Sequence, residues 1–111
     1  MLEIENLDMG QIRRSAEDAC TLLRTLANED RLLLLCQLAK GERRVGELEE
    51  LLDIRQPTLS QQLSVLRNEG LVATRRDGKH IYYSVASIEA LRVLETLYEL
   101  FCAKQQEPSI C

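Results

Sequence analysis

The stretch that decides the fold is residues 55–72, Arg55-Gln-Pro-Thr-Leu-Ser-Gln-Gln-Leu-Ser-Val-Leu-Arg-Asn-Glu-Gly-Leu-Val72. Leu59, Leu63 and Leu66 recur at i, i+4 and i+7, a spacing that places side chains on one face of an α-helix. Pro57 suits the first turn, because its fixed φ matches a helix and its missing N–H is not needed there. Gly70 suits the position just after the helix. The sequence therefore predicts a helix between Pro57 and Gly70 with one apolar face.

The opposite face of this helix is polar and uncharged. At about 100° per residue, Thr58, Gln61, Ser64 and Asn68 point away from the leucines, and Ser60 flanks them. A solvated helix face is usually rich in Glu and Lys, whereas short hydrogen-bonding side chains permit close approach to base-pair edges in a DNA major groove. Two interpretations stay open at this point, a DNA-reading helix and an ordinary polar surface helix.

A short helix is predicted just before this stretch, over residues 45–52. Its apolar residues Val45, Leu48, Leu51 and Leu52 are expected to face inward. Residues 53–56 then make a tight turn. Two helices joined by such a turn, the second beginning with polar residues, form a helix-turn-helix, here at about residues 45–70.

Two further helices are predicted nearer the N-terminus, over residues 11–27 and 31–40. Asn28 is a good N-cap for the second, whose apolar run at 32–36 covers nearly all sides and predicts burial. The first carries a narrow apolar stripe that suits packing against another helix. Its members are Ile12, Ala16, Ala19, Leu23 and Leu26.

A basic hairpin is predicted after the helix-turn-helix. Residues 71–76 and 81–85 read as two strands, and Asp77-Gly78 between them is a strong hairpin-turn signal. A basic hairpin in this position suits a wing, which contacts DNA phosphates or the minor groove, at about residues 71–85. The alternative interpretation is a solvated turn. The basic residues around the tip are Arg75, Arg76, Lys79 and His80.

A last helix is predicted from its cap at Ser87 to about residue 105, with a long apolar stripe. A chain of 111 residues has little core left to cover both this stripe and that of residues 11–27. Pairing the helices at about 11–27 and 87–105 in a homodimer covers both stripes. It also presents two reading helices to a palindromic site.

Composition fits a single domain over residues 1–111 and limits the function classes. The net charge of −4 opposes nucleic-acid binding, but residues 55–83 carry five Arg or Lys against two acids. A local basic surface on an acidic protein is compatible with DNA. There is no apolar run of about 18 residues and no secretion signal, so we expect no membrane partner and a cytoplasmic location. With one His and no Gly-rich phosphate loop, an enzyme is not expected.

Together these elements give a mainly α winged helix-turn-helix, and they resemble the ArsR/SmtB family of bacterial transcriptional repressors. The resemblance rests on Leu26-Ala-Asn-Glu-Asp-Arg-Leu32, Val45-Gly-Glu-Leu48, Gln56-Pro-Thr-Leu-Ser-Gln-Gln-Leu-Ser-Val-Leu-Arg67, Glu69-Gly-Leu-Val72 and Arg75-Arg-Asp-Gly-Lys-His-Ile-Tyr-Tyr-Ser84. Family members are dimers that bind operator DNA until an inducer releases them. The DNA-binding residues expected here are Gln56, Thr58, Ser60, Gln61, Ser64, Asn68, Arg75, Arg76, Lys79 and His80. One departure is Gln62, where members often carry His, and it is expected to alter base preference while leaving the fold intact.

The metal sites of that family need ligand sets that this chain lacks. One type needs clustered cysteines on the third helix, and residues 45–54 contain none. Another needs His and carboxylates on the last helix, but the single His is His80 in the hairpin. We therefore predict no metal site and no cofactor, although metal sensing through scattered thiolates stays open as an alternative.

Two of the four cysteines match a branch of the family. The BigR-like branch carries one Cys in the second helix and one near the end of the last helix, as Cys36 and Cys102 do here. Its members respond to hydrogen sulfide, reactive sulfur species or oxidants by linking the two thiols. The resemblance implies a Cys36–Cys102 di- or polysulfide bridge that lowers operator affinity. The alternatives are two small core residues, or a metal-responsive or constitutive regulator or anti-repressor without a thiol switch. Cys20 and Cys111 are assigned no role.

Overall fold

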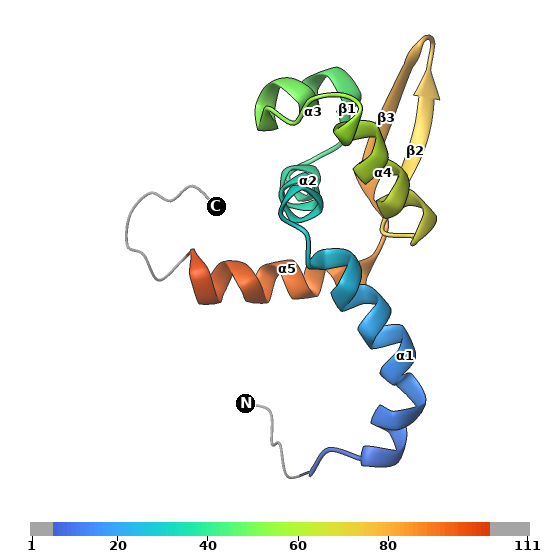
Figure 1. The fold of residues 1–111 in the computed structure, drawn as a ribbon, viewed down its shortest axis with the longest axis vertical. Helices are drawn as coiled ribbons and strands as arrows, with labels where there is room; N and C mark the ends of the chain where they lie inside the picture. Colours follow the sequence, from blue (N-terminus) through green and yellow to red (C-terminus); the bar gives the residue numbers. More distant parts are fainter. Residues whose placement is uncertain (1–5, 103–111) are drawn as a thin grey trace.

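The computed structural model describes residues 6–102. Within them the chain forms five α-helices and three β-strands, drawn in Figure 1. The predicted order of helices and hairpin is confirmed. The elements are α1 (Met9–Leu26), α2 (Glu29–Ala39), β1 (Arg43–Arg44), α3 (Val45–Leu52), α4 (Thr58–Asn68), β2 (Val72–Asp77), β3 (His80–Val85) and α5 (Ile88–Phe101).

The core is built from leucines of α2, α3 and α4. Each of these helices directs its apolar face toward the other two, so the three faces are buried together. One buried leucine contributes about 1.5–3 kcal/mol to stability. The i, i+4, i+7 leucines of the opening stretch all lie in this core. The fully buried leucines are Leu34, Leu35, Leu48, Leu59, Leu63 and Leu66.

The sheet has the strand order β1-β3-β2, and both pairings are antiparallel. The predicted hairpin is β2 and β3, with Asp77 opposite His80 at its tip. Gly78 has φ +65°, a left-handed conformation that glycine adopts without strain. Strand β1 was not predicted, because two residues carry no periodicity and form a strand only through pairing with β3.

Local signals set the helix ends. The Asn28 side chain accepts from the Arg31 N–H at 3.0 Å, and Ser87 Oγ accepts from the Ala90 N–H at 3.0 Å. Gly70, after α4, has φ +78°. Both predicted N-caps and the predicted glycine stop are confirmed. The predicted end of the last helix near residue 105 lies outside the described residues.

Two residues that were predicted to be buried are exposed: Leu33 of α2, which is 42% exposed, and Leu51 of α3. Leu51 of α3 is 55% exposed, whereas Leu48 is fully buried and Val45 and Leu52 pack against the core. Helix α3 has only eight residues. It meets the core along the line of Val45, Leu48 and Leu52, so Leu51 falls at its open edge.

Helices α1 and α5 extend away from this core (Figure 1) and carry exposed apolar side chains. On α1, Met9 is 61% and Leu23 is 57% exposed. On α5, Ile88 is 60%, Tyr98 48% and Leu100 49% exposed. Among the described residues, no helix is long and apolar enough to cross a membrane.

Candidate nucleic-acid interface and cysteine pair

The polar face of α4 is open to solvent. Because Leu59, Leu63 and Leu66 are buried, the residues on the far side of the helix point outward. Ser60, Gln61, Ser64 and Asn68 are exposed, and Thr58 is half-buried. In Figure 1 the helix lies beside the hairpin of β2 and β3. The structure thus presents an uncharged, hydrogen-bonding surface next to a basic hairpin.

Gln56 has a structural partner at the start of α4. Its side-chain oxygen accepts from the Ser60 backbone N–H at 3.1 Å. One of the four N–H groups that a helix start leaves unpaired is satisfied in this way. Gln56 therefore helps to begin α4, a role that the sequence did not indicate.

Gln62 points toward the protein. It is half-buried, and its side-chain oxygen accepts from Arg31 Nη1 at 2.9 Å. Arg31 also donates to the Thr25 carbonyl at 2.6 Å and to the Arg24 carbonyl at 3.3 Å. The departure at Gln62 is thus an internal contact, so any influence on base preference passes through the placement of α4.

The hairpin carries three exposed basic side chains near its tip, one on the two-residue turn and one on each flanking strand. Arg76, Lys79 and His80 are all exposed. The register that pairs Asp77 with His80 holds them around Gly78. Cationic side chains on a projecting hairpin suit contacts with DNA phosphates.

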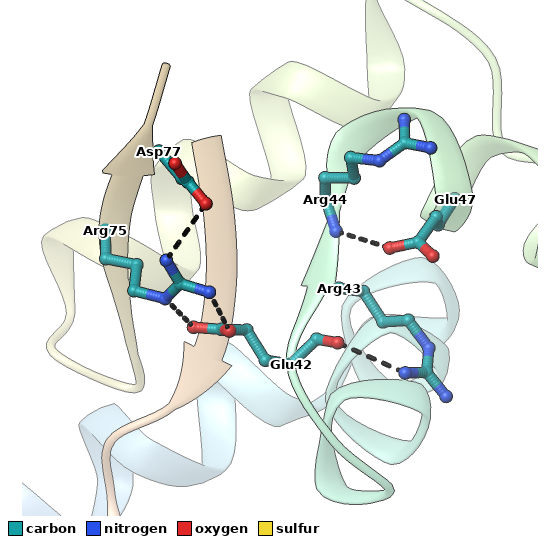
Figure 2. A network of polar contacts seen from close by, with 6 residues as sticks. All are labelled: Glu42, Arg43, Arg44, Glu47, Arg75 and Asp77. Carbon is teal, nitrogen blue, oxygen red and sulfur yellow. Dashed lines mark hydrogen bonds and ion pairs between the residues drawn. The ribbon is translucent and has the colours of Figure 1, made fainter. Parts of the chain in front are cut away.

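Arg75 is exposed at the surface, but its guanidinium is bound by carboxylates of its own chain, as Figure 2 shows. Its Nε and Nη2 donate to the two oxygens of Glu42 at 2.9 and 2.8 Å, which is a bidentate pair. Its guanidinium also stacks on Tyr82, 4.6 Å from the ring centroid. The hydrogen bond to Glu42 raises the pKa of Arg75. Arg75 thus links the wing to the segment before β1, and no local pattern indicated Glu42 as its partner.

A small cleft lies between the wing and the start of α3, and Arg44 in its lining is a basic residue that was not predicted to bind DNA. The cleft has a volume of about 200 Å³ and is lined in part by Arg44, Lys79 and His80. The Arg44 backbone N–H is bonded to Glu47 at 2.9 Å, so this carboxylate lies at the same helix start (Figure 2). Three basic side chains around one cleft favour an anionic group such as a phosphate.

A larger hollow of about 680 Å³ lies between α1, the end of α4 and the start of α5. Its lining includes the carboxylates Asp18, Glu69 and Glu89. A hollow with this charge repels the DNA backbone. The outward face of α4 and the wing are therefore the surface that suits nucleic acid.

The two predicted sensor cysteines are in different states. Cys36 is free and half-buried, and Cys20 is free and exposed. Cys102 is buried and disulfide-bonded, so it is not linked to Cys36 in this structure. Burial raises the pKa of the Cys36 thiol, and the charge of Lys40 opposes that rise. The role of Cys111 falls outside the described residues. No group of three or more His, Cys, Asp or Glu that could hold a metal occurs within residues 6–102.

Known proteins that resemble this chain in sequence and fold are transcriptional regulators. Residues 28–74 match the model of the bacterial regulatory protein family arsR. The chain is 50% identical over 105 residues to the biofilm growth-associated repressor of Agrobacterium fabrum, covering 95% of this chain and 90% of that one. It is 37% identical to the transcriptional activator HlyU of Vibrio cholerae, covering 90% and 93%. The crystal structure of the repressor BigR from Xylella fastidiosa matches with a TM-score of 0.83 and 44% identity, over 86% of this chain and 98% of that one.

Proposed function

The chain belongs to the ArsR family of bacterial regulatory proteins and is a DNA-binding transcriptional repressor similar to BigR; from this premise we propose that it is a sulfur- or oxidant-sensing homodimer. The outward face of α4 would contact the bases of the operator. The wing would contact the DNA phosphate backbone through Arg76, Lys79 and His80. A repressor of this kind acts in the cytoplasm on operator DNA and catalyses no reaction.

The dimer is supported by the apolar faces of α1 and α5. Exposed side chains such as Leu23 and Tyr98 lie on helices that extend beyond the core. A second copy would remove these faces from water and place two α4 helices on one side of a palindromic operator.

The sensing function is supported above all by the placement of Cys36. This free thiol lies on α2, which packs against the reading helix, while Cys102 ends a helix proposed for the dimer. A covalent link between them would connect the reading part of the fold to the dimer contact. A change in the angle between two reading helices lowers affinity because both can no longer fit the same operator.

The chemistry is thiol exchange with a polysulfide of the type R–S–S–S–R. One cysteine thiolate attacks the central sulfur, and one S–S bond breaks to release R–S⁻. The second cysteine thiolate attacks the same central sulfur and releases the second R–S⁻. The products are a Cys–S–S–S–Cys bridge and two thiols. The two cysteines supply the two electrons that reduce the donor, and their two protons go to the released thiolates.

Cys102 has to be a thiol for this reaction. The reaction therefore begins from protein that has been reduced, because Cys102 is disulfide-bonded in the structure. A Cys36 thiolate can also attack the Cys102 sulfur of that disulfide, which displaces its other sulfur as a thiolate. Either route ends with Cys36 and Cys102 joined.

Mass spectrometry of digested protein tests the linkage. Reduced protein treated with an organic trisulfide is expected to yield a peptide pair joined through Cys36 and Cys102, with one sulfur more than a disulfide. Cys20→Ser should leave this pair intact and serves as the matched control. Complete modification of both cysteines without any joined pair would contradict the proposal.

The alternative is a regulator without a thiol switch. It is supported by the partial burial of Cys36, which suits a small core residue. In that case the double variant Cys36→Ser, Cys102→Ser would show the same inducer response as the wild type.

A further inference from the structure

One side chain joins three helices of the fold. The guanidinium of Arg31, in the first turn of α2, donates to the Thr25 carbonyl at 2.6 Å and to the Arg24 carbonyl at 3.3 Å. Both carbonyls belong to the end of α1. The same group donates through Nη1 to the Gln62 side chain of α4 at 2.9 Å. The end of α1 and the middle of α4 are thus fixed to each other through Arg31.

The position of Gln62 makes this contact relevant to DNA reading. Its neighbours on α4 are Gln61, which is exposed on the outward face, and Leu63, which is buried in the core. Gln62 therefore lies at the border between the reading face and the core. A contact at this border controls the rotation of α4 about its own axis more directly than a contact in the middle of either face.

The apolar core sets that rotation through packing alone, without a directional contact. Leu59, Leu63 and Leu66 hold α4 against the protein, but apolar burial has no preferred direction. A hydrogen bond from a planar guanidinium has a preferred direction, and Arg31 is itself held by two carbonyls. The half-buried setting of both side chains shields the contact from water.

We propose that Arg31 is a positioning residue for DNA recognition: it holds Gln62 and so aims the outward face of α4 relative to α1. The inference rests on the proposed use of α4 as the reading helix. Since α1 is proposed for the dimer contact, Arg31 also makes the aim of α4 depend on how two subunits pair. Arg31 itself touches no DNA in this account.

The first test compares operator binding with non-specific binding. Gln62→Leu keeps the size of the side chain and removes the acceptor, and Arg31→Lys removes the planar donor set. Each is expected to weaken operator binding about tenfold. Binding to random DNA and its salt slope should stay unchanged, because no phosphate contact is lost. Arg24→Ala is the matched control, since only the backbone of Arg24 takes part.

A purely structural role would give a different result. It would lower the melting temperature while leaving the ratio of operator to random-DNA affinity at the wild-type value, and that result would overturn the proposal. If Arg31→Lys does not fold, Gln62→Leu alone decides the question. If Gln61→Ala weakens operator binding and Gln62→Leu does not, this inference fails and the reading role of α4 stands. If neither Gln61→Ala nor Gln62→Leu changes operator binding, the positioning role of Arg31 and the reading role of α4 are both contradicted.

A second test uses the variant Gln62→His. A neutral imidazole nitrogen can accept from Arg31, whereas an imidazolium cannot and repels the guanidinium. At about pH 8 the variant should bind the operator within about twofold of wild type, and at about pH 5 it should bind about tenfold more weakly than wild type at the same pH. The wild type, measured at the same pH, corrects for every other effect of pH on binding. An identical pH profile for the two proteins would overturn the proposal.

Discussion

At the scale of single residues, neighbouring side chains of one type have different tasks. Arg75 and Arg76 are adjacent on β2 and both are exposed, yet Arg75 is bound to Glu42 and stacked on Tyr82, while Arg76 lies nearer the tip. Both were predicted to bind DNA. The charge of Arg75 is largely matched by Glu42, so the structure favours Arg76 as the phosphate contact.

Replacing these two arginines separately should distinguish their tasks. Arg76→Ala is expected to weaken binding to all DNA sequences and to reduce the slope of log affinity against log salt by about 0.9, the value of one phosphate contact. Arg75→Ala should leave that slope close to wild type. Fluorescence anisotropy with random and operator duplexes at several salt concentrations measures both. An equal loss of slope in the two variants would show that Arg75 also meets a phosphate.

Cys36 should react slowly near neutral pH. Burial raises the pKa of its thiol, so at pH 7 less thiolate is present than in an unperturbed cysteine. Below its pKa the thiolate fraction grows about tenfold per pH unit, and the alkylation rate should grow with it. Lys40→Gln removes the charge that lowers this pKa. The variant should therefore react more slowly still at a given pH. Peptide mass spectrometry over a pH series measures both rates, and a flat profile between about pH 7 and about pH 8.5 would contradict a raised pKa.

At the scale of elements, α4 combines two faces with separate functions. Its leucines contribute to stability, and its opposite face is free to meet DNA. Gln61 is exposed on that face. It is long enough to make a paired hydrogen bond to an adenine edge.

Gln61→Ala should therefore reduce specificity without reducing stability. We expect operator binding to weaken by about 1–3 kcal/mol, the value of one such base contact, while binding to random DNA and the melting temperature stay the same. The complementary change is Leu63→Ala, which should destabilise the fold by about 2–5 kcal/mol through a buried cavity. Denaturation and anisotropy together separate the two effects. If Gln61→Ala binds every DNA sequence as the wild type does, Gln61 makes no contact with a base.

The elements that were predictable are those specified by local pattern. The leucine spacing of α4, the Asp77-Gly78 turn and the caps at Asn28 and Ser87 are each contained in a few consecutive residues. The missed features depend on segments that are distant in sequence. Arg31 meets Gln62 and Glu42 meets Arg75 only after folding, and β1 exists only through its pairing with β3. Leu51 has the spacing of a core residue, but no element within residues 6–102 covers it.

At the scale of the whole molecule, the arrangement of α1 and α5 favours a pair of subunits. Leu23→Glu places a charge on the exposed apolar face of α1 and should convert the protein to a monomer. Operator binding should weaken with it, because one α4 helix reads only one half-site. Leu51→Glu is the control, since Leu51 is 55% exposed and lies on α3. Analytical ultracentrifugation measures the oligomeric state. A Leu23→Glu protein that stays dimeric would contradict the proposed dimer contact through α1.

Joining Cys36 to Cys102 is proposed to lower the affinity of the protein for its operator. The most direct test of this proposal is anisotropy with a labelled operator, on fully reduced protein before and after treatment with an organic trisulfide. We expect wild type and Cys20→Ser to lose operator affinity by about 5–150-fold, the range of typical allosteric coupling, and to recover it on reduction. Cys36→Ser and Cys102→Ser should keep their affinity throughout. An equal loss of operator affinity in Cys36→Ser would contradict regulation through a Cys36–Cys102 bridge.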